Sequence, residues 1–150
     1  MIEVRLQPEP FDAGAELRRL DALGGGGVAS FTGIVRGDDG LTELLLEHHP
    51  GMTLAMMQTL AREAVARWAL LGVTIIHRHG LLLPGDPIVF VAATAKHRAA
   101  ALDACASLID HLKTSAPFWK RETFADGRSQ WVEPRASDDA AAARWLRDER

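Results

Sequence analysis

The chain has 150 residues, of which 47% are hydrophobic and 25% are charged, and it carries a net charge of −3. This length and composition predict one globular domain over residues 1–150 rather than a disordered chain, and the negative charge disfavours broad attraction to nucleic acid. No apolar run approaches the roughly 20 residues of a membrane span, and the N-terminus does not read as a signal peptide, so we expect no membrane contact and a cytoplasmic location.

The first quarter of the chain predicts a strand followed by a helix. Apolar and polar residues alternate over residues 2–6, which is the period of a half-buried strand. From Asp12, a predicted N-cap, leucines recur at helical spacing as far as Leu23. The four glycines at 24–27 end this helix in a turn or mobile loop, and they lack the following Gly-Lys-Ser/Thr of a phosphate-binding loop.

Residues 28–36 and 41–48 read as two strands. The polar connection at 37–40 contains two glycines, so we expect the strands to form an antiparallel hairpin. A long amphipathic helix then begins after Pro50, with a predicted apolar stripe along one face: Met52, Met56, Leu60, Ala64, Trp68 and Leu71.

The second half predicts strands at 73–79 and 88–95 around a turn at 84–86, and then a helix from about 97 to 113. Cys105 is the only cysteine, which excludes an internal disulfide, and apolar neighbours at helical spacing indicate that it packs in the core.

Residues 118–124 and 129–133 flank Asp126-Gly127, which indicates a hairpin. A last helix follows with Ser137 as its predicted N-cap. Several hairpins and few crossovers predict an α+β fold, a mostly antiparallel sheet with packed helices.

Lysine is rare and clustered in this chain. Fourteen of the 17 basic residues are arginine, and the three lysines, Lys96, Lys113 and Lys120, lie within one stretch. An amine can lose its proton whereas a guanidinium stays charged, so a site that needs a titratable base requires lysine and not arginine. A chance clustering of three lysines explains this distribution about equally well.

Two stretches could carry chemistry. His97 and Arg98 lie where a strand passes into a helix, and a helix N-terminus with two basic side chains can receive a phosphate, although a solvated basic turn has the same sequence. Lys113 ends that helix and Lys120 lies among aromatic residues on the next strand, so either could act as acid, base or nucleophile. The alternative is a helix-end charge and an exposed strand residue.

Arg36 ends a predicted strand and could bind an anion or be an ordinary strand end. A metal site is not expected, because His48 and His49 point to opposite faces of their strand and His77 and His79 lack an evident third ligand.

In order and at similar separations, the blocks FTGIVR, LEHHPGM, HRHG with LLLPGD, AKHRAA, DHLKTSAPFWKRE and WVE resemble the large subunit of molybdopterin synthase through nearly the whole chain. The resemblance implies a hammerhead-like fold, a homodimer, and no metal or redox cofactor. It also implies a small ubiquitin-like sulfur carrier as partner, whose Gly-Gly thiocarboxylate gives sulfur to cyclic pyranopterin monophosphate to form the dithiolene of molybdopterin.

Residue by residue, the resemblance places the essential lysines of the family on Lys113 and Lys120. Its phosphate- and pterin-binding residues fall on Arg36, His97 and Arg98, and the His-Arg pair is expected to come from the opposite subunit. Arg121 and Glu122 match the rest of the family's WKRE-type block as substrate-binding residues.

The sequence departs from the family pattern at two positions. Ile34 replaces a frequent basic residue and His49 a frequent aromatic one, and the loop at 37–40 is short, so we expect a weaker substrate contact and a different pocket rim. Two rival functions remain, a noncatalytic relative that only binds the ubiquitin-like carrier, and a small anion-binding enzyme acting on another phosphate ester.

Overall fold

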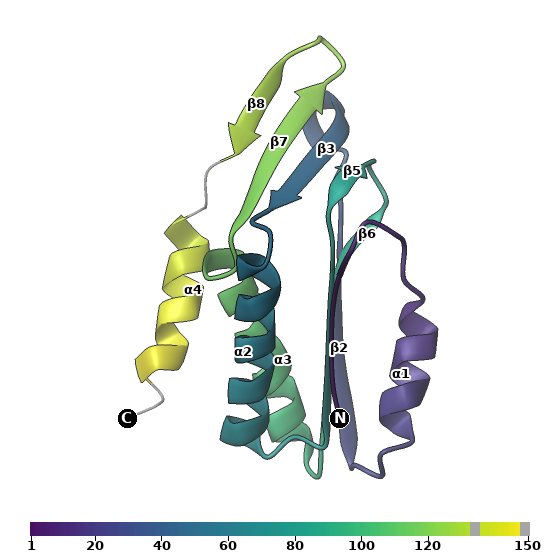
Figure 1. The fold of residues 1–150 in the computed structure, drawn as a ribbon, viewed down its shortest axis with the longest axis vertical. Coiled ribbons are helices and arrows are strands. Elements are labelled where there is room, and N and C mark those ends of the chain that lie inside the picture. The colour runs from purple at the N-terminus through teal and green to yellow at the C-terminus, as the bar shows by residue number, and fades with distance from the viewer. Residues whose placement is uncertain (133–135, 148–150) are drawn as a thin grey trace.

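The computed structural model describes residues 1–132 and 136–147, which form two four-stranded sheets with helices against the first (Figure 1). The first sheet, called sheet A, has the spatial order β1 (Ile2–Gln7), β4 (Gly72–Arg78), β6 (Pro87–Ala95) and β2 (Gly27–Ile34). The second, called sheet B, has the order β5 (Gly80–Leu82), β3 (Leu41–His48), β7 (Phe118–Phe124) and β8 (Ser129–Val132). The expected α+β class with mostly antiparallel pairing is confirmed, and β1–β4 is a parallel pair.

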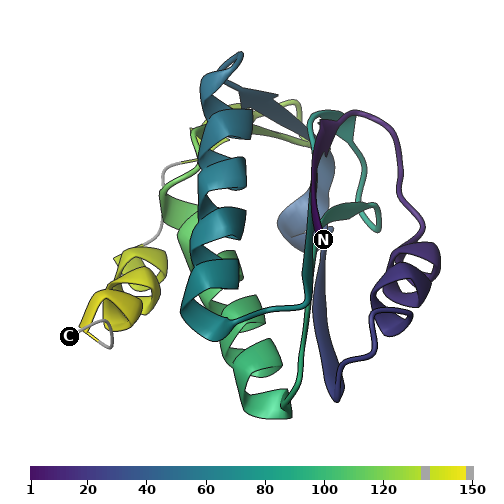
Figure 2. The same cartoon turned by 60° about the horizontal axis from the view of Figure 1, so that its bottom comes forward.

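Helices cover both faces of sheet A (Figures 1 and 2). Helices α2 (Met52–Trp68) and α3 (Arg98–Thr114) pack on one face over the largest apolar cluster, while α1 (Ala13–Asp21) covers the other with Leu20 against Phe90. Strand β4 is therefore buried along its whole length. None of the described helices is both long and apolar enough to cross a membrane.

The predicted hairpin of residues 28–36 and 41–48 is wrong. Strand β2 pairs with β6 in sheet A, whereas β3 pairs with β5 and β7 in sheet B. Val35 is tied to the turn before β6, since its N–H donates to Asp86 (2.9 Å) and its carbonyl accepts from Gly85 (2.8 Å). A short 3₁₀ helix, Asp38–Gly40, then carries the chain from one sheet to the other.

The apolar stripe predicted for α2 is displaced by one residue in the first two turns of the helix only. Met52 and Leu71 are exposed, and the buried positions belong to Thr53 and Met57, followed by Leu60 and Ala64 as predicted. The helix ends at Trp68, because Ala69 adopts a left-handed conformation with φ of 50° that stops the helical hydrogen bonding.

The other helices and the second hairpin follow the sequence prediction closely. Asp12 caps α1 by accepting from the N–H of Ala15 at 3.1 Å, and β7 and β8 form the hairpin predicted from Asp126-Gly127. The last helix, α4 (Ala136–Arg147), starts one residue before Ser137, whose side chain lies outside the described part. Trp145 anchors α4 by donating to Asp110 at 2.7 Å.

Candidate active site

The segment that joins the two lysines is held in place by a buried hydroxyl. Lys113 lies in the last turn of α3 and Lys120 on β7, with Pro117 between them. Thr53, fully buried in the first turn of α2, donates from Oγ1 to the carbonyl of Pro117 at 2.8 Å and accepts from the N–H of His49 at 3.0 Å. The path of the chain from one lysine to the other is thus fixed by a side chain of a different helix.

Phe118, next to this anchor, connects sheet B to sheet A. Its ring stacks on that of His77, with centroids 3.9 Å apart and planes inclined by 22°. His77 is buried near the end of β4, and its Nδ1 lies 2.8 Å from the carbonyl oxygen of Arg78. The two sheets therefore meet at an aromatic contact inside the stretch that carries both lysines.

The charges of both lysines affect the pKa of His77. Burial lowers the pKa of His77 from 6.5 to about 3 against the opposing effect of the Arg78 carbonyl, and the charges of Lys120 and Lys113 lower it further. The charges of two amines from different elements therefore act on one buried, neutral ring.

The two lysines differ in exposure. Lys113 is exposed at the C-terminal end of α3, where the helix dipole favours a cation, whereas Lys120 is half-buried. Lys120 lies opposite the fully buried Leu46 on β3, so it is on the inner face of sheet B. One amine is open to solvent, and the other is partly covered on the inner face of sheet B.

Neighbouring residues of β7 point to alternate faces of sheet B. Glu122 lies opposite buried Leu44 and shares the inner face with Lys120, whereas Arg121 is exposed on the outer face. Of this predicted pair, Glu122 is therefore the residue that accompanies the lysines within one chain.

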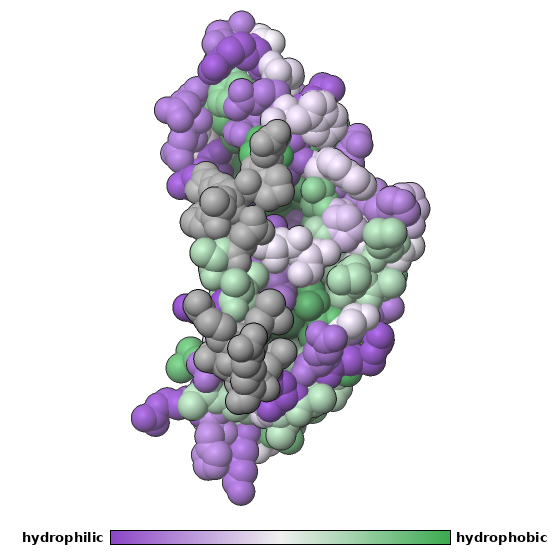
Figure 3. Space-filling model, turned by 90° about the vertical axis from the view of Figure 1, so that its left-hand side faces the viewer, coloured by the Kyte–Doolittle hydropathy of each residue, from purple (hydrophilic) through white to green (hydrophobic). Residues whose placement is uncertain are grey.

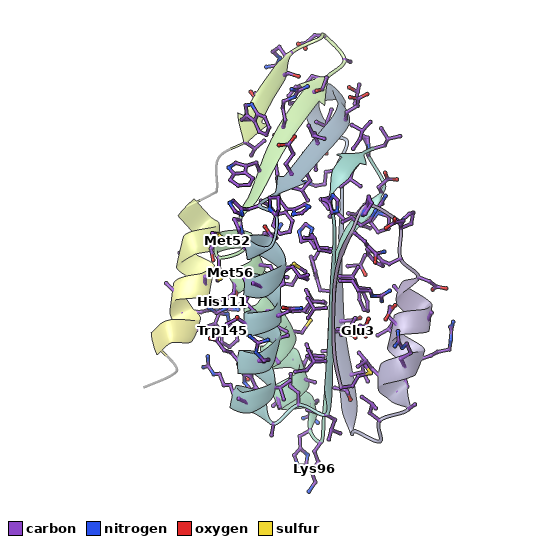
Figure 4. All side chains as sticks on the ribbon, viewed as in Figure 1. Glu3, Met52, Met56, Lys96, His111 and Trp145 are labelled. Atoms are coloured by element: carbon purple, nitrogen blue, oxygen red, sulfur yellow. The ribbon has the colours of Figure 1, made fainter. Side chains whose placement is uncertain are left out.

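His97 and Arg98 lie at the other end of α3. His97 is the N-cap of the helix, and the 15 residues from Arg98 to Lys113 correspond to about 23 Å at 1.5 Å per residue. The neighbouring Lys96 marks this end of the molecule, far from Met52 at the end of α2 nearer sheet B (Figure 4). Within one chain, this basic pair is separate from Lys113.

The glycine run at 24–27 packs tightly against that strand-helix junction. The N–H of Gly26 donates to the carbonyl of Ala95 at 2.9 Å, and a Cβ on Gly26 would overlap the carbonyl oxygen of Lys96. The run is a turn that only glycine permits, and it fixes the backbone beside His97 and Arg98.

Arg36 follows β2 and is exposed. Its Nε lies 3.5 Å from Oδ2 of Asp38, an ion pair between two well-solvated side chains. Arg36 is thus paired with a residue of the loop that follows its own strand.

Two further histidines lie at the sheet junction, and sequence reasoning did not bring them together. The rings of His48 and His79 are 4.4 Å apart, and burial followed by the charge of His48 lowers the pKa of His79. No group of three or more His, Cys, Asp or Glu side chains in residues 1–132 and 136–147 could hold a metal ion. His77 itself was considered only as a metal ligand, because the sequence has no local signal that pairs it with Phe118.

A separate apolar groove of about 570 Å³ runs between edge strand β2 and α3. It is lined by Val28, Ala29, Ser30, Phe31, Leu102, Cys105, Ala106, Ile109 and Asp110. Cys105 packs at its base, as predicted, and burial raises the pKa of this thiol to about 11, so it stays protonated. The groove holds no group suited to acid-base chemistry at neutral pH apart from Asp110, which bonds to α4.

Figure 3 shows the face around α4, on which hydrophilic and hydrophobic residues are mixed and hydrophilic ones gather toward the tip of sheet B. The exposed apolar side chains of the groove, Val28, Phe31 and Leu102, belong to β2 and α3.

Comparisons with known proteins agree with this architecture. The family described as "MoaE protein" matches residues 6–115. A molybdopterin synthase catalytic subunit from Pseudomonas aeruginosa is 50% identical over 147 residues, covering 95% of this chain and 97% of that protein. A solved molybdopterin biosynthesis MoaE protein from Burkholderia ambifaria superposes with a TM-score of 0.82 at 47% identity, covering 97% of this chain and 98% of that one.

A more distant structure shares the fold. A complex of subunits 1 and 2 of molybdopterin-converting factor from Helicobacter pylori contains a chain that matches with a TM-score of 0.73 at 20% identity, covering 89% of this chain and 91% of that one.

Proposed function

Because this chain belongs to the MoaE protein family and has the function of a molybdopterin synthase catalytic subunit, we propose that it acts as a sulfurtransferase with Lys113 and Lys120 at its reaction centre. The sulfur comes from the thiocarboxylated C-terminus of a small ubiquitin-like carrier and goes to cyclic pyranopterin monophosphate. In each transfer the thiocarboxylate sulfur forms a bond to a side-chain carbon of the pterin, which loses an oxygen substituent. Water then cleaves the bond between this sulfur and the carrier, whose C-terminus leaves as a carboxylate, and two transfers make the dithiolene of molybdopterin.

The observation that carries this proposal is the anchored segment between the two lysines, in which Thr53 holds Pro117 and the ring of Phe118 stacks on His77. Lys113, being exposed, is open to the incoming carrier tail and acts as acid, base or transient acyl acceptor. Lys120, half-buried on the inner face of sheet B, orients the tail, and Glu122 on the same face contacts substrate. Arg121 lies on the outer face, so it can bind substrate only where a second chain covers that face.

The phosphate of the substrate requires Arg36, His97 and Arg98 beside these lysines. His97 and Arg98 are about 23 Å from Lys113 along α3, so a single chain does not complete the site. A twofold axis across the middle of α3 would place α3 of a second copy antiparallel and bring its basic pair to Lys113. We therefore assign the pair to the partner subunit of a homodimer.

The groove between β2 and α3 supports a second copy as its occupant. Strand β2 is an edge of sheet A with the sequence GVASFTGI, which contains no charge to discourage pairing. Val28, Phe31 and Leu102 expose apolar side chains along it, and α3 itself forms the other wall. An antiparallel copy covering this groove would bury apolar surface and supply the missing basic residues in one step.

The small carrier is the second proposed partner. The Helicobacter pylori structure contains two subunits of its converting factor, which supports an equivalent complex here. Thiocarboxylates are reduced sulfur species, so we place the reaction in the cytoplasm, where thiols are kept reduced.

Mixing the purified chain with thiocarboxylated carrier and cyclic pyranopterin monophosphate tests the proposal. Formation of the dithiolene supports it. Carrier binding without product would instead favour a noncatalytic carrier-binding relative, and neither binding nor product would favour an enzyme for another phosphate ester.

A further inference from the structure

Arg36 lies where the chain leaves sheet A, just after the pairing of β2 with β6 becomes irregular at Gly33 and Ile34. Its own side chain is exposed, whereas that of the preceding Val35 is 5% exposed. Val35 packs with three leucines of sheet B: Leu44, Leu46 and Leu82. The direction in which Arg36 projects therefore depends on what holds its two neighbours in the chain, Val35 and Gly37.

The turn of residues 83–86, which precedes β6, holds Val35 by both of its backbone groups. The N–H of Val35 donates to the carbonyl of Asp86 at 2.9 Å, and the carbonyl of Val35 accepts from the N–H of Gly85 at 2.8 Å. That carbonyl belongs to the peptide group that leads into Arg36. The backbone on the N-terminal side of Arg36 is thus fixed to this turn.

The same turn contacts the residue on the other side of Arg36. A Cβ on Gly37 would lie 3.1 Å from Cβ of Pro84, so the backbone of Gly37 runs close against the proline ring. Glycine permits this approach because it has no side chain. Arg36 therefore stands between two residues that both rest on the 83–86 turn, and its side chain points away from the buried Val35.

Asp86 closes the turn twice. Its N–H donates to the carbonyl of Leu83 at 3.0 Å, and its carboxylate Oδ2 accepts from the N–H of Leu83 at 2.9 Å. Between these residues Pro84 is followed by Gly85 with φ of 91°, the sequence and conformation of a type II turn. The carboxylate therefore ties together the two ends of the turn on which Val35 depends.

We propose that Asp86 is a positioning residue for Arg36: its carboxylate closes the 83–86 turn, and the turn directs the guanidinium toward the phosphate of the substrate. A guanidinium binds phosphate through hydrogen bonds of fixed direction, so its contribution depends on where its backbone lies. Asp86 itself touches no substrate. The inference rests on the proposed function, which assigns Arg36 to the phosphate.

The reconstituted reaction with the full-length chain tests the inference through KM and kcat for cyclic pyranopterin monophosphate. Asp86→Ala removes the oxygen that accepts from Leu83, whereas Asp86→Asn keeps an acceptor oxygen and removes the charge. Asp126→Ala is the matched control. Asp126 also accepts a backbone N–H within a turn, that of Arg128 at 2.9 Å, but in the hairpin of β7 and β8.

We expect Asp86→Ala to raise KM about fivefold and to change kcat by less than about twofold, because the phosphate contact is misplaced and the lysines are not. Asp86→Asn and Asp126→Ala should keep KM within about twofold of the unchanged protein. An unchanged KM in Asp86→Ala, or an equal rise in either of the other two variants, would overturn the inference.

A double substitution tests whether Asp86 acts through Arg36. Arg36→Ala should raise KM about tenfold or more, the usual scale for losing a hydrogen bond from a charged group. The chain with both Arg36→Ala and Asp86→Ala should have the KM of Arg36→Ala alone, because no guanidinium is left to direct. Effects of the two substitutions that multiply would show that Asp86 acts independently of Arg36, and would overturn the inference.

Hydrogen exchange tests the turn without substrate. The N–H of Val35 should exchange at least about tenfold faster in Asp86→Ala, and Asp86→Asn should restore the slower exchange. Unchanged exchange of Val35 would overturn the inference. A failure of the proposed function gives a different pattern, because Arg36→Ala would then leave KM unchanged and Asp86 would have no phosphate ligand to position. A raised KM in Arg36→Ala beside an unchanged KM in Asp86→Ala overturns this inference alone.

Discussion

Phe118 and His77 lie 41 residues apart in the sequence, and their stacked rings join sheet B to sheet A within the stretch that carries Lys113 and Lys120. The contact lies in the sequence between the two lysines that we assign to one site. One comes from the end of a helix packed on sheet A and the other from a strand of sheet B, so their relation depends on how the sheets are joined.

Replacing Lys113 by alanine should lower the rate of dithiolene formation at least about a hundredfold, the usual scale for losing a positioned acid, base or nucleophile. The amine is exposed, so folding and oligomeric mass should not change. Product formation in the reconstituted reaction measures the loss. Lys113→Arg keeps the charge but not a titratable amine, and its full activity would show that only charge is needed.

Arg62→Ala, which removes an exposed basic side chain from α2, is the control for this substitution. It should leave turnover unchanged. Full activity of Lys113→Ala would show that Lys113 takes no part in the reaction.

Thr53→Val should lower the free energy of unfolding by about 1–3 kcal/mol, because the N–H of His49 and the carbonyl of Pro117 both lose their buried partner. Turnover should fall as well, since Pro117 fixes the segment between the lysines. Urea unfolding and the reconstituted reaction measure the two effects. Thr42→Val, which removes an exposed hydroxyl from the carbonyl of Thr123, should change neither by a comparable amount.

The stability of the fold should fall as the pH drops from about 6.5 toward 3 because of His77. Its pKa is about 3 in the fold against 6.5 as the ordinary value, so in this window the unfolded chain binds the extra proton and acid favours unfolding. The slope from this group approaches about 1.4 kcal/mol per pH unit.

Urea unfolding at a series of pH values checks this expectation. His77→Phe should remove most of the slope, whereas His79→Phe should remove less, because His79 is less deeply buried. An unchanged slope in His77→Phe would show that other groups cause the acid sensitivity.

Local signals in the sequence predicted the elements well, because they depend on neighbouring residues. Asp12 caps α1 as its spacing indicated, and the hairpin at Asp126-Gly127 forms with Gly127 at φ of 89°. The glycines at 37 and 40 look similar, yet they carry the chain between sheets. Val35, just before this connection, is buried with Leu44, Leu46 and Leu82 between the two sheets. The periodicity of a strand predicts which of its faces is buried, but not with which other strand it pairs.

The candidate site was predictable only through the family resemblance. Composition and spacing left Lys113 and Lys120 as one possibility among helix-end and strand residues. The contact of His77 with Phe118 joins residues that are distant in sequence, so no local pattern indicates it.

Phe31→Lys should convert the homodimer to a monomer, because a charge in the middle of the groove between β2 and α3 opposes burial by a second copy. Light scattering or sedimentation at several concentrations measures the mass. Leu81→Lys places the same charge on an exposed leucine of β5, outside the groove, and should leave the mass unchanged. If the Phe31→Lys variant were still a dimer, the interface would not lie in the groove between β2 and α3.

Mixing two inactive variants should restore activity if the site is shared between subunits. Lys113→Ala lacks the amine, and a chain with both His97→Ala and Arg98→Ala lacks the basic pair, so each homodimer has two defective sites. In a mixed dimer, the intact Lys113 of one chain meets the intact His97 and Arg98 of the other, and one of the two sites is complete.

Random exchange makes half of the dimers mixed, so the expected activity is about a quarter of that of the unchanged protein. The mixture is unfolded and refolded together, and product is measured against each variant refolded alone. If all three groups belonged to one chain, every site in the mixture would lack a group and the activity would stay at the level of the separate variants. The roughly 23 Å that separate Arg98 from Lys113 along α3 are the reason to expect restoration.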